Sequence, residues 1–315
     1  MRVLVALGGN ALLQRGQPPD ANTQQANVLI AAAAIAEIAR EHDVVVTHGN
    51  GPQVGMLALE SAADPALSRP YPLDILGAQT QGMIGYLLGQ ALQNALPGRQ
   101  VATLVTQTLV SVADPEFADP AKFVGPVYTE TEGARLAAER GWVVRQDGTS
   151  WRRVVPSPRP QRVVETRLIR TLTESGAIVV CAGGGGVPTV RDEHTGLLRG
   201  VEAVVDKDLT AALLAEALEV DALLLLTDVP AVMTGFGTPE QAPIRDITPA
   251  RLRSAPFPAG SMGPKVDAGC RFVELTGDLA AIGALDAPAA MLRGEVGTII
   301  TPTGVPRKAP LPTGN

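Results

Sequence analysis

Short aliphatic runs, rich in β-branched residues, alternate along this chain with longer stretches rich in Ala, Leu and Gln. The run Arg2–Leu7 stops at Gly8-Gly9, and residues 43–47 (DVVVT) form a second run that stops at the loop HGNGPQVG. Between them, residues 22–41 contain neither glycine nor proline and are typical of a helix. Apolar strands that alternate with helices predict an α/β fold with a mostly parallel central sheet covered on both faces.

The same rhythm continues to about residue 301, which predicts one large domain over residues 1–301. Further helices are expected at residues 74–94, 208–217 and 261–276. Further strands are expected at residues 100–105, 177–181, 222–227, 280–284 and 297–300. The remaining residues, 302–315, are rich in proline, and we expect them to be loosely ordered.

Residues 114–160 interrupt this rhythm. They are rich in proline, glycine and charge, hold both tryptophans of the chain, and include GWVVRQDGTSWRRVVPSP, which resembles a small hairpin bounded by turn residues. A long surface excursion is the alternative, but loops of this length without structure are uncommon in compact domains. We therefore expect an inserted subdomain that protrudes from the sheet.

Charge and composition exclude several classes of protein. The chain has a formal net charge of −6 and only two Trp, three Tyr and five Phe, so it lacks the basic, aromatic surface of a nucleic-acid-binding protein. The opening MRVLVALGGN is not a signal peptide, and no apolar stretch approaches the length that crosses a bilayer. Cys181 and Cys270 lack metal-ligand spacing, and we expect both to be buried. A soluble cytoplasmic protein is expected, without a membrane or nucleic-acid partner.

Glycine-bearing turns follow four of the expected strands. Any one of them could be a tight turn and nothing more, but four at one sheet edge predict a ligand site, because open parallel sheets bind ligands at the carboxyl ends of their strands. Glycine lets backbone amides approach an anion closely. The spacing matches neither GxGxxG nor GxxxxGK[ST], so the sequence predicts a phosphate site of another kind. The turns are Gly8-Gly9-Asn10, Gly49-Asn50-Gly51, Gly183 to Gly186, and Thr227-Asp228 with Gly235 and Gly237.

Lysine is rare in this chain, with 4 Lys against 22 Arg, and its positions are therefore informative. Lys207 and Lys265 stand at the starts of expected helices, in VVDKD and GSMGPK, and Lys122 lies in the insertion. A compact ammonium on a flexible stem can follow a phosphoryl group during its transfer, whereas a guanidinium favours one fixed geometry. We interpret these three as candidate phosphate ligands, and Lys308 as a surface residue of the tail.

Asp206 and Asp208 flank Lys207. A carboxylate between lysines can orient them or bind Mg²⁺ through water, whereas the plain structural role of Asp208 would be an N-cap. His48 either donates to a small carboxylate substrate or packs beneath its loop. His42 and His194 lie in polar turns, where we expect no catalytic role.

Eight motifs in this order resemble the carbamate kinases of the amino acid kinase family, and the likeness runs from Met1 to about Thr301. They are VALGGNALLQRG, HGNGPQVG, QTQGMIGYLLGQAL, RRVVPSP, CAGGGGVP, GVEAVVDKDLTAALLAE, LLLLTDV and GSMGPKVDA. The resemblance implies an open αβα sandwich with a small protruding subdomain, assembled as a homodimer. It also implies a Mg²⁺-dependent reaction in which ATP and carbamate interconvert with ADP and carbamoyl phosphate, commonly toward ATP in arginine breakdown.

The resemblance also implies roles for individual residues. Lys207 and Lys265 would bridge the nucleotide phosphates, oriented by Asp208, and Lys122 would arrive from the protruding subdomain as a lid. It would supply the charge that related kinases place on the first strand, where this chain has Ala6. Residues implied at the transferred phosphoryl group and carbamate are Gly8, Gly9, Asn10, His48, Gly49, Asn50, Gly51, Gly184 and Gly185. Residues implied at the nucleotide are Asp206, Thr227, Asp228, Met233, Gly237, Thr238, Pro239 and Met262.

Two departures from the family pattern concern the nucleotide and the lid. Met233 stands where the family usually has an aromatic residue, and Phe123 follows Lys122 where proline is frequent. The expected mechanism is direct in-line transfer, with Mg²⁺ held mainly by the nucleotide phosphates and water and by no dedicated protein site. Three alternatives stay open from the sequence: another small-acid kinase of the same family, a non-catalytic nucleotide sensor, and an enzyme working in the carbamoyl-phosphate-forming direction.

Overall fold

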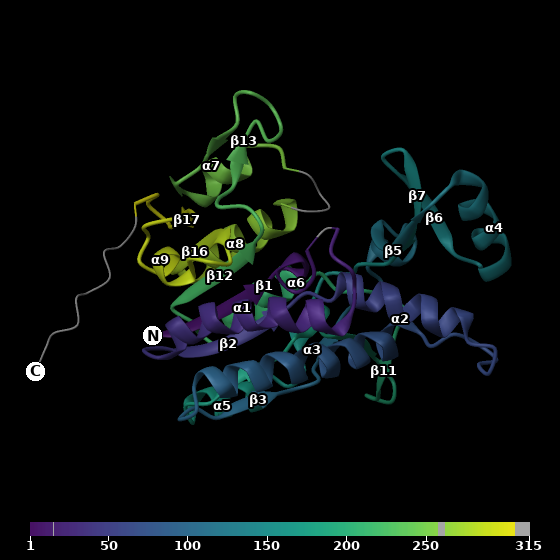
Figure 1. Ribbon diagram of the computed structural model, residues 1–315, viewed down its shortest axis with the longest axis horizontal. Helices are drawn as coiled ribbons and strands as arrows, with labels where there is room; N and C mark the ends of the chain where they lie inside the picture. The colour runs from purple at the N-terminus through teal and green to yellow at the C-terminus, as the bar shows by residue number, and fades with distance from the viewer. Residues whose placement is uncertain (15, 258–261, 306–315) are drawn as a thin grey trace, which may run out of the picture.

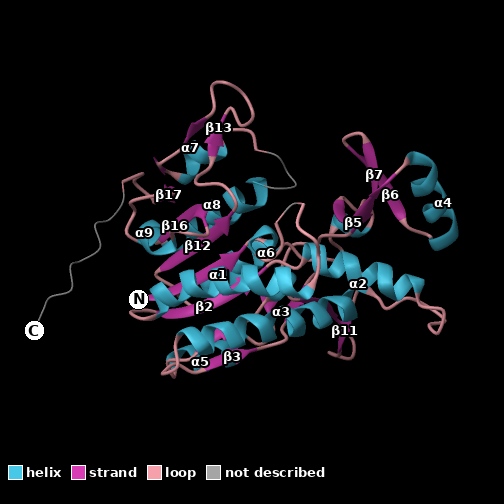
Figure 2. Ribbon diagram, viewed as in Figure 1, coloured by secondary structure: helices cyan, strands magenta, loops and turns pink. Residues whose placement is uncertain are grey.

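The computed structural model describes residues 1–14, 16–257 and 262–305. Within this part of the chain, eight strands form the central sheet, and every neighbouring pair is parallel except β16 and β17. Figures 1 and 2 show helices on both sides of this sheet. In spatial order the strands are β15 (Asp246–Ile247), β17 (Thr298–Ile300), β16 (Leu279–Ala284), β12 (Ala222–Thr227), β1 (Arg2–Leu7), β2 (Asp43–His48), β9 (Ile178–Val180) and β3 (Val101–Thr103).

The two faces of β1 belong to two separate hydrophobic cores. Val3, Val5 and Leu7 pack in one core, and Leu4 and Ala6 pack in the other, because successive side chains of a strand point to opposite faces. Apolar neighbours on both faces explain why residues 3–7 contain no polar side chain. The predicted α/β fold, with its mostly parallel sheet and two helical layers, is confirmed.

Helices of the first layer, on the side of Val5, are α1 (Ala21–Ala39), α3 (Leu73–Ala95) and α9 (Pro288–Leu292). Those of the second layer are α5 (Thr166–Glu174), α6 (Lys207–Ala217), α7 (Pro249–Arg253) and α8 (Met262–Thr276). Asp20 caps α1 by accepting a 2.8 Å hydrogen bond from the Thr23 amide, which explains why the helix starts there. None of the helices in the described part of the chain is both long and apolar enough to cross a membrane.

A second, smaller sheet extends the body beside α3. Its order is β11 (Leu198–Gly200), β10 (Val187–Arg191), β4 (Gln107–Leu109) and β8 (Arg162–Val163). The sequence predicted one strand over residues 100–105, and this second sheet was not predicted. The chain instead leaves the central sheet after β3 and turns at Thr106, whose backbone and side chain bond to Gln81 of α3.

A three-stranded sheet stands apart from the body on the right of Figure 1. It consists of β5 (Lys122–Tyr128), β7 (Ser150–Val155) and β6 (Val143–Asp147), covered by α4 (Glu130–Arg140). We call residues 114–160, including the short η2 helix (Pro115–Phe117), the protruding subdomain. The hairpin predicted from GWVVRQDGTSWRRVV is β6–β7, in which Asp147 pairs with Ser150.

The protruding subdomain contacts the body through α2 (Gly51–Ala63), the helix that follows β2. Gly55 of α2 lies so close to β5 that an added Cβ would stand 3.0 Å from the Gly125 Cα. Helix α2 was not predicted from the sequence, because its first residues are Gly51 and Pro52. Proline is well tolerated in the first turn of a helix, where its missing N–H has no intrahelical partner to lose.

Candidate active site

Three glycine turns meet at the carboxyl ends of β1, β2 and β9. A Cβ on Gly49 would stand 2.7 Å from the Gly9 nitrogen, so the turns after β1 and β2 touch through their backbones. A Cβ on Gly184, in the η3 turn (Gly183–Gly185) after β9, would stand 2.2 Å from the Asn50 amide nitrogen. No side chain other than hydrogen fits at these points, which explains the glycines that the sequence places there.

The η3 turn is held in an uncommon backbone conformation. Gly184, Gly185 and Gly186 all have positive φ, at 63°, 89° and 85°. The Gly185 carbonyl accepts hydrogen bonds from Thr108 Oγ1 at 2.7 Å and from Thr210 Oγ1 at 3.1 Å. Two hydroxyls from different elements therefore fix the turn against the start of α6.

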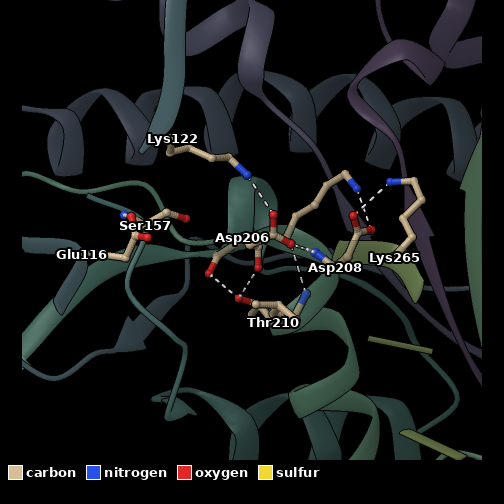
Figure 3. Close-up of polar contacts among 10 residues, drawn as sticks. Glu116, Lys122, Ser157, Asp206, Asp208, Thr210 and Lys265 are labelled. Atoms are coloured by element: carbon tan, nitrogen blue, oxygen red, sulfur yellow. Dashed lines mark hydrogen bonds and ion pairs between the residues drawn. The ribbon is translucent and has the colours of Figure 1, made fainter. Parts of the chain in front are cut away.

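The three candidate lysines converge on two carboxylates, as Figure 3 shows for Lys122, Lys265 and both aspartates. Lys122 Nζ lies 2.8 Å from Asp206 Oδ2. Asp208 bonds two ammonium groups, since its Oδ1 lies 2.6 Å from Lys207 Nζ and its Oδ2 lies 2.9 Å from Lys265 Nζ. Three elements contribute to this lysine cluster: β5, α6 and α8. The sequence spacing could not show that residues 122, 207 and 265 meet, but their rarity singled them out.

The start of α6 positions both carboxylates. Asp206 is the N-cap residue, and its Oδ1 accepts hydrogen bonds from the amides of Asp208 at 2.9 Å and Leu209 at 3.3 Å. The alternative that Asp208 is the N-cap is therefore wrong. Asp208 lies in the first helical turn, and both of its oxygens bind lysines. Its backbone amide is tied to Asp206, so the two carboxylates are held at a fixed spacing.

Burial makes the electrostatics of this cluster strong. Asp208 is 4% exposed, Lys265 is 8% exposed, and the Lys207 side chain is 14% exposed. Three ammonium groups against two carboxylates leave one formal positive charge, in a place where water screens little. The cluster therefore carries a net positive charge, and its ammonium groups could donate hydrogen bonds to a phosphate group in place of the carboxylates.

The same burial shifts the pKa values of the cluster. Burial lowers the pKa of Lys207 to about 8, against the raising effect of the Asp208 carboxylate. Burial acts to raise the pKa of Asp208, but the two neighbouring ammonium groups outweigh it and hold that pKa well below its ordinary range. For Lys265, burial acts to lower the pKa, and the Asp208 carboxylate outweighs it, so the net shift is upward. Of the two lysines bonded to Asp208, Lys207 therefore loses its proton first.

His48 packs beneath the η3 turn. Its side chain is buried, its Nδ1 lies 2.9 Å from the Gly49 carbonyl oxygen, and a Cβ on Gly183 would stand 2.4 Å from its ring. Burial lowers the pKa of His48 to about 4, so the ring is neutral near pH 7. Of the two interpretations given by the sequence, the geometry favours packing. Asn50, also buried, donates a 2.8 Å hydrogen bond to Thr80 Oγ1 beneath Gly184.

Apart from Asp206, which belongs to the lysine cluster, the expected nucleotide residues lie at the end of β12, on the hairpin beyond it and at the start of α8. Thr227 ends β12, and its hydroxyl donates to Asp228 Oδ1 at 3.1 Å. Beyond it, β13 (Met233–Thr234) and β14 (Ala242–Pro243) form a hairpin whose exposed connection carries Gly237, Thr238 and Pro239. Met262 begins α8 and packs against the core. This hairpin stands above α8 in Figure 1, and the interactions of the described residues do not join it to the lysine cluster.

Two residues singled out in the sequence lie wholly or partly outside the described part of the structure. Asn10 belongs to the short η1 helix (Gly9–Ala11), but its side chain lies outside the described part of the structure. Lys308, with the rest of residues 306–315, also lies outside it. Gly8 and Gly51 follow β1 and β2 as expected, and the Gly8 amide donates to the Leu226 carbonyl at 3.0 Å. Cys181 and Cys270 are both buried, as expected from the sequence.

Two buried polar residues that support the η3 turn, Gln81 and Thr106, were not predicted from the sequence. Gln81 Oε1 accepts a hydrogen bond from the Thr106 amide at 3.0 Å, and the Thr106 hydroxyl accepts one from the Ala182 amide at 2.8 Å, immediately before the η3 turn. Both side chains are almost fully buried. The available signal was the motif QTQG, which places polar residues inside an otherwise apolar helix.

Comparisons with known proteins agree with this geometry. The model of the amino acid kinase family matches residues 1–282. A carbamate kinase from Rhizobium meliloti is 57% identical over 305 residues, covering 96% of this chain and 93% of that protein. One from Haemophilus influenzae is 50% identical, covering 96% and 97%. The solved structure of a Giardia lamblia carbamate kinase bound to AMP-PNP has a TM-score of 0.87 at 41% identity, covering 95% and 98%. The chain therefore belongs to the carbamate kinases of the amino acid kinase family.

Proposed function

We propose that this protein transfers a phosphoryl group between the nucleotide pair ATP/ADP and carbamate, in the interconversion of ATP and carbamate with ADP and carbamoyl phosphate. The observation that carries this proposal is the lysine cluster, in which Lys122, Lys207 and Lys265 meet two carboxylates beside three glycine turns. Cations and backbone amides at one sheet edge suit two anions that must approach each other.

In this mechanism the lysines exchange partners. Lys207 and Lys265 would turn from Asp208 toward the β- and γ-phosphates, and Asp208 would stay between them and keep their separation. Lys122 would leave Asp206 for the transferred phosphoryl group when the protruding subdomain closes as a lid. Each change replaces one carboxylate oxygen by a phosphate oxygen, so the lysines remain paired throughout. Gly8, Gly9 and Asn10 would face the phosphoryl group, and Gly49, Asn50, Gly51, Gly184 and Gly185 the carbamate.

No general base is needed in this mechanism, because carbamate is already an anionic nucleophile. The neutral, covered ring of His48 fits this chemistry, since it can support the η3 turn without accepting a proton from the substrate. Catalysis would come from positioning two anions against their mutual repulsion and from neutralising the charge of an in-line transition state.

Mg²⁺ is expected to arrive with the nucleotide. Asp206 and Asp208 are the acidic residues of the site, and their oxygens already accept hydrogen bonds from lysines and from the first amides of α6. Such a donor set fits an ion held mainly by phosphate oxygens and water, with Asp206 in reach of a bound water. When bound, the ion neutralises charge on the phosphates.

Three further properties belong to this proposal. We infer that the reaction runs toward ATP in arginine breakdown, that the enzyme acts in the cytoplasm, and that it assembles as a homodimer. On the nucleotide side, Met233 would contact the base where related proteins place an aromatic residue, with Thr227, Asp228, Gly237, Thr238, Pro239 and Met262 around it. These inferences rest on the motifs by which the sequence resembles the carbamate kinases.

The testing experiment is ATP formation from ADP, carbamoyl phosphate and Mg²⁺, followed by a luciferase assay. Acetyl phosphate, acetylglutamyl phosphate and UDP serve as competing phosphoryl donors, and EDTA removes the metal. We expect rapid ATP formation with carbamoyl phosphate alone and none after EDTA treatment. Preference for another donor would favour a different small-acid kinase, and nucleotide binding without any turnover would favour a sensor.

A further inference from the structure

Besides its contact with α2, the protruding subdomain docks on a short segment of the body, residues 202–206, which we call the docking segment. Arg153 Nη2 lies 2.8 Å from Glu202 Oε1 at one end, and Lys122 Nζ lies 2.8 Å from Asp206 Oδ2 at the other. Between them the Val204 amide donates a 3.0 Å hydrogen bond to the Pro156 carbonyl. Three contacts thus follow one another along the docking segment, and the last of them, between Lys122 and Asp206, places Lys122 in the lysine cluster.

Arg153 and Lys122 come from neighbouring antiparallel strands of the subdomain. Arg153 of β7 pairs with Val124 of β5, and Lys122 lies two residues before Val124. Residues two apart on a strand, and residues directly opposite on the neighbouring strand, point to the same face of the sheet. Both cations thus project from the face that meets the docking segment, and fixing one of them restricts where the other can reach.

Glu202 is suited to fix Arg153 because its second oxygen is anchored in the body. The backbone amide of Leu73, the first residue of α3, donates a 2.8 Å hydrogen bond to Glu202 Oε2. A carboxylate at a helix N-terminus is stabilised by the unpaired amides and by the helix dipole. Glu202 therefore bridges a long helix of the core and the protruding subdomain.

On the subdomain side, Arg153 is held in place by aromatic packing. Its guanidinium lies 4.6 Å from the centre of the Trp142 ring, and the Arg153 side chain is only 16% exposed. Beside it, a cavity of about 20 Å³ is lined by residues of α2 and β5, so the space next to the close Gly55–Gly125 contact is not completely filled. An incompletely packed interface depends more on its polar contacts for a fixed orientation.

We propose that Glu202 is a positioning residue for phosphoryl transfer. By binding Arg153, it orients the protruding subdomain so that Lys122 reaches the reacting phosphoryl group. This inference rests on the proposed function, because Lys122 acts on that group. Glu202 itself touches neither substrate; it acts through Arg153 and the strand pair β5–β7.

The test compares Glu202→Gln with wild type in the ATP-forming assay. The amide keeps an acceptor for Leu73 and removes the charge that binds Arg153. We expect kcat to fall about three- to fivefold, in the range that a partly exposed ion pair can contribute, with KM for ADP changed less than twofold. Arg153→Gln should give a similar fall. Glu139→Gln is the matched control, because it breaks an ion pair with Arg135 inside the subdomain, and its kcat should equal that of wild type.

Epistasis separates positioning from a general structural role. In a Lys122→Ala background, Glu202→Gln should cause no further loss of kcat, since the residue that it positions is absent. An equal loss in both backgrounds, or a wild-type kcat for Glu202→Gln, would overturn the proposal. Hydrogen exchange gives a readout that does not depend on activity: peptides of β5 and β7 should exchange faster in Glu202→Gln, and those of β1 should not. Unchanged exchange in β5 and β7 would also overturn it, whereas wild-type inactivity in the assay would refute the proposed function instead.

Discussion

Lys265→Met tests the lysine cluster most directly. Methionine keeps the length and most of the volume of the lysine stem, so the side chain at this buried position, 10% exposed as lysine, still fills its space between α8 and α6. The change removes the ammonium that lies 2.9 Å from Asp208 Oδ2 and leaves Lys207 at 2.6 Å from Oδ1. The buried carboxylate therefore keeps one partner, and the protein should still fold.

The expected magnitude follows from what the site loses. The cluster falls from three ammonium groups to two against two carboxylates, which removes its net positive charge. Loss of one preorganised donor to transition-state charge costs about 10²–10³ in kcat, or about 2.7–4 kcal/mol. A buried charge left without a partner lowers the free energy of unfolding by about 3–5 kcal/mol. The loss in Lys265→Met should be smaller, because Lys207 still pairs with Asp208.

A second effect runs through Lys207. The positive charge of Lys265 adds to burial in lowering the pKa of Lys207 to about 8. Without that charge, the pKa of Lys207 should rise. The alkaline limb of kcat/KM against pH should therefore move to higher pH in Lys265→Met while the maximal rate falls. Simple damage to the fold would lower the rate without moving the limb in this direction.

Initial rates of ATP formation from pH 6 to 10, with urea unfolding of each variant, measure both effects. Arg271→Met is the matched control, because Arg271 also lies on α8 and pairs with Glu216 of α6 at 3.7 Å, but is half-exposed and six residues farther along the helix. We expect wild-type kcat for this control and a stability change below about 1 kcal/mol. Near-normal turnover of Lys265→Met, or an equal loss in Arg271→Met, would refute the assignment.

Three further predictions concern other parts of the site. Lys122→Ala should lower kcat by tenfold or more, by analogy with the loss of one transition-state donor, and change KM for ADP little; the opposite pattern in steady-state kinetics would contradict the lid role. Gly184→Ala should displace Asn50, which lies 2.2 Å from the new Cβ, and lower kcat by about tenfold or more, whereas Gly196→Ala, with a similar φ of 70° and open space around it, should lose only about 1–2 kcal/mol of stability and no activity. For wild type, kcat/KM should fall as pH rises through about 8, where Lys207 loses its proton. The contribution of Lys207 to the free energy of unfolding should instead rise with pH between about pH 8 and 10.5, the ordinary lysine pKa. In this window the unfolded chain binds a proton that the folded chain has released, and urea titrations at several pH values measure the effect.

The sequence predicted those elements whose periodicity is set by burial alone. Arg2–Leu7 was predicted to the residue, because both faces of residues 3–7 are covered and no polar side chain follows Arg2 in the run. Helices α2, α4, α5, α7 and α9 were not predicted, and for two of them the reason is identifiable. Gly51 and Pro52 at the start of α2 read as a loop, although proline is compatible with the first helical turn. In α5, most side chains are polar and only Ile169 and Thr173 are buried, so its apolar stripe is short.

The site was predictable in its residue types and only partly in its contacts. Glycine turns at strand ends and three rare lysines indicated an anion site, because parallel topology brings those strand ends together. Which carboxylate binds which lysine depends on how α6 and α8 pack, and this is a tertiary property. The sequence therefore left Asp208 between two roles. In the structure Asp206 caps the helix, and Asp208 binds Lys207 and Lys265.

The contrast between arginine and lysine in this chain follows from what each contact has to do. The arginines of the protruding subdomain hold static contacts: Arg152 donates to the Gly125 carbonyl and Asp147, and Arg153 lies against Trp142 while it binds Glu202. A planar guanidinium with several donors suits such fixed geometry. A lysine that follows a phosphoryl group during its transfer must release its carboxylate partner in each catalytic cycle. An ammonium bonded to one carboxylate oxygen can change its partner with little rearrangement of the side chain. Lys122→Arg should therefore impair turnover more than it impairs docking of the protruding subdomain.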